Sequence, residues 1–260
     1  IGGGIGGQIW KDRAGDGRLS TTNFSGMYSY HLQLQKNTRD FFIVKAAIQA
    51  GGFQRSIDFS KLRFGDQIHP RLGFIYQTKE KLPATGLFTT KIIPDFSTGI
   101  LAFTSKFYAG IAVHHIVEPS QSFFDNPESV LPRKITVHGG MQIAVDNYKR
   151  NPNTFISPNI LFQRQSKFTQ VNFGAYLLKN YFIAGLWYRQ TSPNSDAMMA
   201  LVGFKKDAVR IGYSYDLTVS SARSAAPGSH EVSLIVELQK YKPSQKRKWK
   251  GLKCPTNFGN

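Results

Sequence analysis

The chain has 260 residues, enough for one large domain or two small ones, and nothing in its composition forces a split. Basic residues outnumber acidic ones 33 to 16, which gives a formal net charge of +17. A charge of this sign and size is typical of proteins that bind nucleic acid or an anionic membrane surface. No apolar run reaches the ~18–20 residues of a membrane-spanning helix, and one cysteine, Cys254, excludes an internal disulfide and a cysteine zinc cluster. The chain starts at Ile1 inside a strand pattern, so we expect further residues upstream of it.

Strict alternation of apolar and polar residues predicts β-strands along the chain. Between Val209 and Leu217 every second residue is large and apolar, while Arg210, Gly212 and Ser214 between them are polar or small. Similar patterns predict twelve strands, at residues 1–10, 24–34, 41–57, 91–104, 107–117, 135–145, 154–165, 168–178, 181–190, 197–204, 209–217 and 232–238.

The lengths of the connections indicate what the apolar strand face meets. Short turns (36–40, 105–106, 179–180, 205–207) alternate with long loops (11–21, 58–88, 118–133, 191–196, 218–228), although 146–153 is longer and 164–167 shorter than this rule requires. A membrane barrel has short turns at one rim and long loops at the other. We therefore predict an all-β fold, a transmembrane antiparallel β-barrel, with an outward band that includes Tyr28, Tyr30, Leu32, Phe182, Ala184, Leu186, Tyr188, Val209, Ile211, Tyr213 and Leu234.

No catalytic, cofactor-binding or metal-binding residue is predicted, and we expect a protein that is not an enzyme. His114 and His115 point to opposite faces of a strand, and a cluster of His31, His138 and His230 rests on no spacing argument. The glycine-rich start, IGGGIGG, lacks the following helix of a dinucleotide fingerprint. Basic residues spread over turns and loops favour lipid head groups over nucleic acid as their partner.

Two long loops and the C-terminal tail are the predicted partner-binding segments. The loops are too apolar for free solvent, and we expect them to pack together, plug the lumen or dock a partner. Residues 239–260 form a basic tail that the barrel topology places in the periplasm. The residues predicted to bind partners are Phe64, Ile68, Leu72, Phe74, Phe123, Phe124, Val130, Leu131, Lys246, Arg247, Lys248 and Trp249.

Several phrases of the sequence carry a family resemblance. KDRAGDGRLSTTNFSGMYSYHL, DFSKLRFGDQIHPRLGFIYQT, LPRKITVHGG and the closing GYSYDL, GSHEVSL and KCPTNFG occur in this order over nearly the whole chain. In this the chain resembles the PorP/SprF family of type IX secretion outer-membrane proteins. The resemblance implies two further strands upstream, which would make fourteen, and no catalytic site.

The resemblance also implies a function in the type IX export and gliding machinery. We expect a monomeric outer-membrane barrel, residues 1–238, that anchors an exported adhesin by its C-terminal sorting domain, while the tail at 239–260 meets periplasmic components of the same machinery. A porin or hydrophobic-solute channel is the alternative. A soluble nucleic-acid-binding β protein is a distant third.

Overall fold

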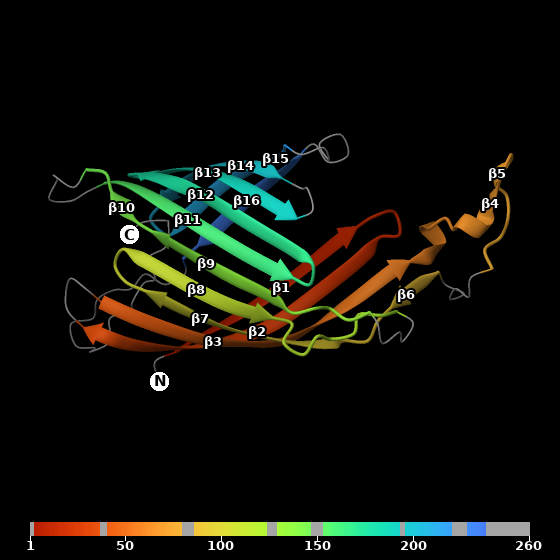
Figure 1. Cartoon of the computed structure of the whole chain (residues 1–260), viewed down its shortest axis with the longest axis horizontal. Helices are drawn as coiled ribbons and strands as arrows, with labels where there is room; N and C mark the ends of the chain where they lie inside the picture. Colours follow the sequence, from red (N-terminus) through yellow and green to blue (C-terminus); the bar gives the residue numbers. More distant parts are fainter. Residues whose placement is uncertain are drawn as a thin grey trace. The chain divides into compact units, whose positions relative to one another are not determined.

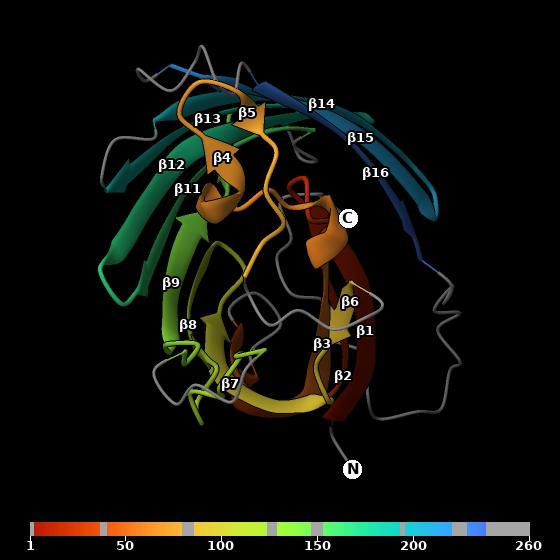
Figure 2. The ribbon, with the colours of Figure 1, turned by 90° about the vertical axis from the view of Figure 1, so that its right-hand side faces the viewer.

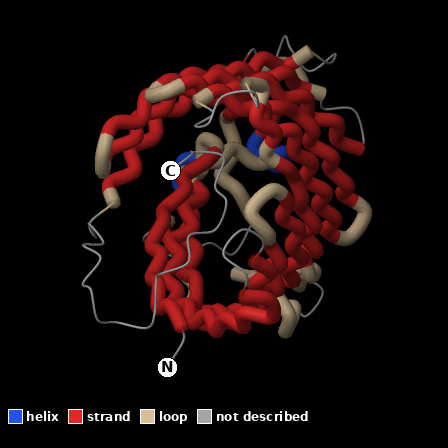
Figure 3. The backbone as a smooth tube through the Cα atoms, turned by 90° about the vertical axis from the view of Figure 1, so that its left-hand side faces the viewer, coloured by secondary structure: helices blue, strands red, loops and turns tan. Residues whose placement is uncertain are grey.

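The computed structural model describes residues 3–36, 41–79, 86–123, 129–146, 153–192, 196–219 and 228–237. Strands dominate this part of the chain, and the two helical segments in it are single 3-10 turns, η1 (Phe59–Lys61) and η2 (Gly65–Gln67), coloured blue in Figure 3. No helix in these ranges is long and apolar enough to cross a membrane. The prediction of an all-β fold is confirmed.

Long strands follow one another along the chain and pair with their neighbours in sequence (Figure 1). They are β1 (Gly3–Ala14), β2 (Leu19–Lys36), β3 (Phe41–Asp58), β7 (Ile93–Phe103), β8 (Phe107–His114), β9 (Lys134–Met141), β11 (Thr154–Gln165), β12 (Phe168–Lys179), β13 (Phe182–Ser192), β14 (Ala197–Lys206), β15 (Val209–Thr218) and β16 (Gly228–Val236). These twelve form the main path of one sheet, in agreement with the predicted number.

Four short strands complete the description. β6 (Leu87–Thr89) pairs with β3, and β10 (Ile143–Ala144) pairs with β11. β4 (Ile68–His69) and β5 (Gly73–Phe74) form a separate two-stranded sheet. The last two lie inside the long segment that the sequence places between strands, so this predicted loop has structure of its own.

Contacts divide the chain into two compact units. The first comprises Ile1–Tyr30, Ala47–Thr98 and Val113–Arg133, and the second comprises His31–Ala46, Gly99–Ala112 and Lys134–Asn260. In the second unit, β11 to β16 pair in antiparallel order and lie side by side in one curved layer (Figure 2). In the first unit, β1 pairs with β2 along its whole length, from Gly3↔Tyr30 to Ala14↔Leu19.

Burial along the strands is inverted relative to a water-soluble protein. Among the residues the structure describes, ten buried side chains are polar or charged and six are apolar, whereas large apolar side chains are exposed on strand after strand. β13 shows the alternation clearly, because Phe182 and Leu186 are 66% and 67% exposed while Ile183 is 5% exposed. Each such side chain gains roughly 1.5–3 kcal/mol on leaving water, so an apolar environment must cover this face.

Polar side chains on the opposite face of the second unit bond to one another. The Tyr108 hydroxyl donates a hydrogen bond of 2.6 Å to Oδ1 of Asn159, which is buried. Arg189 Nη2 lies 2.8 Å from Asp216 Oδ2. A face that carries such groups suits water and polar partners, and the outward band predicted from the sequence is the exposed apolar face, with Tyr188 half-buried.

Most strand limits lie within a few residues of the prediction, although β8 ends at His114 and not at residue 117, and β16 begins at Gly228 and not at residue 232. β11 occupies the predicted residues 154–165. The predicted loop at residues 11–21 is wrong for most of its length, because β1 continues to Ala14 and β2 begins at Leu19. Gly15 has a positive φ of 71° and accepts a 3.1 Å hydrogen bond from the Arg18 amide, so a four-residue turn is enough to join the strands.

Candidate functional site

In the first unit, hydrogen bonds hold the two ends of the segment between β3 and β6; we call these ends its base. Asp58 caps η1, since its Oδ1 accepts hydrogen bonds from both the amide and the hydroxyl of Ser60. The Ser60 hydroxyl thereby lowers the pKa of the Asp58 carboxyl group. The Phe59 amide donates to the Gly86 carbonyl at 2.7 Å, which joins the start of the segment to its end.

Beyond this base the chain folds into the hairpin of β4 and β5. Ile68 pairs with Phe74, and His69 pairs with Gly73. Nδ1 of His69 accepts 3.2 Å hydrogen bonds from the amides of Arg71 and Leu72, which closes the turn. Gly73 has a φ of 76°, a conformation that costs other residues roughly 1–2 kcal/mol.

Three further hydrogen bonds hold the segment that leaves the hairpin. The amides of Ile75 and Tyr76 donate to the Gln67 carbonyl at 3.1 and 3.3 Å. The Lys79 amide donates to Oδ2 of Asp66 at 2.6 Å. The hairpin is thus ordered by its own polar contacts and does not depend on an apolar core.

Its apolar side chains are consequently exposed. We call this set the hairpin surface: Ile68 is 48% exposed, Leu72 68%, Phe74 49%, Ile75 53% and Tyr76 51%. Three of the five are predicted partner-binding residues. Phe64, also predicted, is half-buried at the start of η2, where its amide donates to Oε1 of Gln67 at 2.8 Å.

The segment that carries the hairpin surface also carries three cations. Cζ of Arg63 lies 4.7 Å from the centre of the Phe74 ring, and Arg71 and Lys79 are exposed. Within the described residues none of these three cations forms a salt bridge, whereas Lys61 lies 3.7 Å from Asp58. The surface therefore combines exposed apolar groups with positive charge that is not neutralised within these ranges.

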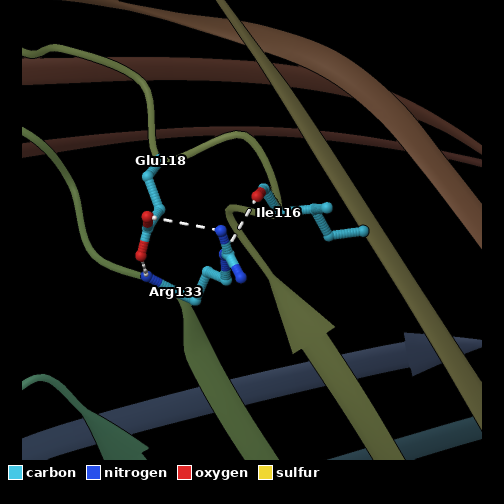
Figure 4. Close-up of polar contacts among 3 residues, drawn as sticks. All are labelled: Ile116, Glu118 and Arg133. Atoms are coloured by element: carbon cyan, nitrogen blue, oxygen red, sulfur yellow. Dashed lines mark hydrogen bonds and ion pairs between the residues drawn. The ribbon is translucent and has the colours of Figure 1, made fainter.

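The second long loop, residues 115–133, is closed at its base. The Glu118 amide donates to the His115 carbonyl at 3.0 Å, and both residues have a positive φ. Arg133 reaches back to this turn: Nε donates to the Ile116 carbonyl at 3.1 Å, and Nη2 lies 3.4 Å from Oε2 of Glu118 (Figure 4). This ion pair is exposed and contributes roughly 0.2–1 kcal/mol.

The two sides of the loop also pair with each other. Ser120 and Val130 form a β-bridge, and the Leu131 amide donates to the Pro119 carbonyl at 2.9 Å. Of the predicted residues here, Val130 is 45% exposed and Leu131 is half-buried.

Phe123, at the tip of this loop, packs against both ends of the other one. Its ring meets Phe59 of η1 at 6.5 Å and Phe88 of β6 at 5.9 Å, both edge-to-face. Cζ of Arg55 lies 5.4 Å from the centre of the same ring, and Nη1 of Arg55 donates to the Gln121 carbonyl at 3.2 Å. We call this group the Phe123 clamp.

The structure brings the predicted loop residues into two groups with different positions. Ile68, Leu72 and Phe74 are exposed on the hairpin, and Phe123 is half-buried in the clamp. The sequence did not single out Arg55, Phe59 or Phe88. Phe124, Lys246, Arg247, Lys248, Trp249 and the whole tail at 239–260 lie outside the described residues.

An antiparallel sheet with an apolar exposed face and a bonded polar face defines a β-rich membrane protein. The family model described as "Type IX secretion system membrane protein PorP/SprF" matches residues 2–236. The chain therefore belongs to the PorP/SprF family, as the sequence resemblance implies, and is a membrane component of the type IX secretion system. This is a family of secretion components and not of enzymes. No curated protein and no solved structure matches the chain significantly.

Proposed function

We propose that the protein is an outer-membrane anchor of the type IX secretion machinery that holds an exported adhesin at the cell surface by its C-terminal sorting domain. Family membership supports a role in this machinery. The hairpin surface is the observation that carries the anchoring role, because an ordered segment exposes five large apolar side chains by about half or more.

The energetics favour a docking role for this surface. Full burial of one large apolar side chain gains roughly 1.5–3 kcal/mol. Association and side-chain ordering consume part of that gain, so several such residues together are needed for stable retention. The hairpin supplies five between Ile68 and Tyr76, on a base that its own hydrogen bonds hold in place.

Two more contacts belong to the proposal. The basic tail at 239–260 would meet periplasmic components of the machinery, since its lysines and arginines form the one true cluster of charge in the sequence. Outer-membrane lipid would cover the exposed apolar strand faces.

The experiment replaces residues 63–79 by a short Gly-Ser turn in the producing cell. Retention of the adhesin on the cell surface should be lost, and the adhesin should appear in the medium. Heat-modifiable migration of the variant in detergent gels shows whether the sheet has folded, and membrane fractionation shows whether it reaches the outer membrane. Unchanged retention by a folded variant would refute the anchoring role.

The alternative, a porin or hydrophobic-solute channel, is tested by conductance in planar bilayers. The ion pair of Arg189 and Asp216 on the polar face of the second unit is the observation that supports this alternative. Large steady single-channel currents from the purified protein would favour the channel. Their absence, together with loss of adhesin by the hairpin variant, favours the anchor.

A further inference from the structure

We infer that the hairpin surface recognises an acidic, apolar polypeptide segment, and that the Phe123 clamp positions the hairpin for it. This inference rests on the proposed anchoring role and specifies the chemistry of the segment that is anchored.

The first step concerns charge. Arg63 lies over the Phe74 ring, and Arg71 and Lys79 are exposed in the same segment. Asp66, the one acid among the described residues 63–79, already accepts hydrogen bonds from the Thr78 hydroxyl and the Lys79 amide. Its carboxylate is turned to the backbone of its own segment. A partner with carboxylates next to apolar residues would match both properties of the surface, and one with lysines would be repelled.

The second step concerns the orientation of Arg63. Its guanidinium carbon lies 4.7 Å from the centre of the Phe74 ring, a cation–π contact worth roughly 0.5–1 kcal/mol at an exposed site. The N–H groups of a guanidinium lie in its own plane, where they can donate two parallel hydrogen bonds to one carboxylate. An arginine fixed in this way loses less side-chain entropy when it binds an acid.

The third step separates protein from lipid as the occupant. Phe96 in β7 is one of the exposed apolar side chains of the strands, the faces that lipid would cover. Within the first unit the hairpin lies well past the ends of β3 and β6, away from those faces (Figure 1). This position favours a polypeptide outside the bilayer over the bilayer itself.

The fourth step assigns the second loop a positioning role. Phe123 contacts Phe59, just before the hairpin segment, and Phe88, just after it. Arg55 contacts the Phe123 ring and donates hydrogen bonds to Gln121, so its guanidinium group belongs to the clamp. The clamp fixes the base from which the hairpin projects, while the hairpin makes the contact.

The test uses the purified full chain in detergent and three synthetic peptides of one length. The first alternates Glu with Leu and Val, the second carries Gln in place of Glu, and the third carries Lys. The intact protein should bind the Glu peptide at least about tenfold more tightly than the Gln peptide, more weakly as salt rises, and should not bind the Lys peptide.

Two variants and one control locate the effect. The double variant Arg71→Glu and Lys79→Glu should lose at least about tenfold in affinity for the Glu peptide, and Leu72→Ser should weaken all binding. Lys167→Glu makes the same charge reversal as each of the two replacements, at an exposed turn between β11 and β12, and should bind like the intact protein. Equal affinity of the double variant and the intact protein would overturn the inference.

Further outcomes distinguish failure of the acidic-partner inference from failure of the proposed anchoring role. Binding to anionic phosphatidylglycerol vesicles at the hairpin without binding to the Glu peptide would replace the polypeptide by lipid and overturn the inference. In cells, the double variant is compared with the chain that lacks residues 63–79. If the double variant retains the adhesin and the shortened chain does not, the inference of an acidic partner is wrong and the anchoring role is still supported. Retention that survives both would remove the anchoring role as well.

Discussion

Replacement of Phe123 by alanine tests whether the second loop holds the first in place. The substitution removes two edge-to-face ring pairs, each worth about 0.5–1.5 kcal/mol, and one cation–π contact worth about 0.5–1 kcal/mol. Because Phe123 is only half-buried, the lower part of this range applies, about 2 kcal/mol in total. At about 1.4 kcal/mol per factor of ten, local opening of the clamp should become about thirtyfold more frequent.

Hydrogen–deuterium exchange measures this opening directly. Peptides that contain Phe59 and the strand β6 should exchange faster in Phe123→Ala, because the Phe59 amide is bonded to Gly86 only while the base is closed. The control is Phe168→Ala, which removes a ring that is 45% exposed at a turn of the second unit. Unchanged exchange around Phe59 in Phe123→Ala, or an equal change in the control, would refute the clamp.

Three smaller perturbations test the local chemistry of the loops. Arg133→Gln should lower the free energy of unfolding by no more than about 2 kcal/mol in a denaturant titration, because it removes one exposed ion pair with Glu118 and one hydrogen bond to the Ile116 carbonyl; a larger loss would show that Arg133 does more than close the loop. Gly73→Ala should lower the free energy of opening the hairpin by roughly 1–2 kcal/mol, because alanine is strained at a φ of 76°. Amide exchange at residues 68–76 should then be faster. The Asp58 carboxyl group has a lowered pKa in the folded chain, so its cap stabilises η1 at neutral pH and is lost as the pH falls through that lowered value. The NMR shift of the Ser60 amide should follow this titration and should lose its pH dependence in Asp58→Asn.

The strands could be predicted from the sequence because side-chain alternation follows directly from strand geometry. The pattern around Val209 and Ile211 predicted an exposed apolar face, and both residues are exposed. The loop predicted at 11–21 failed because Gly15, Asp16 and Gly17 signal a turn but do not say how far the strands run on each side of it. The pairing of Ala14 with Leu19 determines that length, and it depends on the partner strand.

The loops were predictable only in part, for a different physical reason. Composition showed that residues such as Leu72 and Phe123 are too apolar for free solvent, but it gives no information on which of them cover each other. The clamp joins residues more than thirty positions apart without any periodic spacing, so no local pattern could reveal it. The hairpin is ordered by hydrogen bonds to the Gln67 carbonyl and the Asp66 carboxylate, which composition does not reveal either.

The proposal that the hairpin anchors the adhesin is tested most directly by measuring adhesin retention in cells whose chain lacks residues 63–79. The claim predicts that the variant folds, reaches the outer membrane and releases the adhesin into the medium, while the matched Lys167→Glu chain retains it. A folded variant without the hairpin that still holds the adhesin at the surface would contradict it.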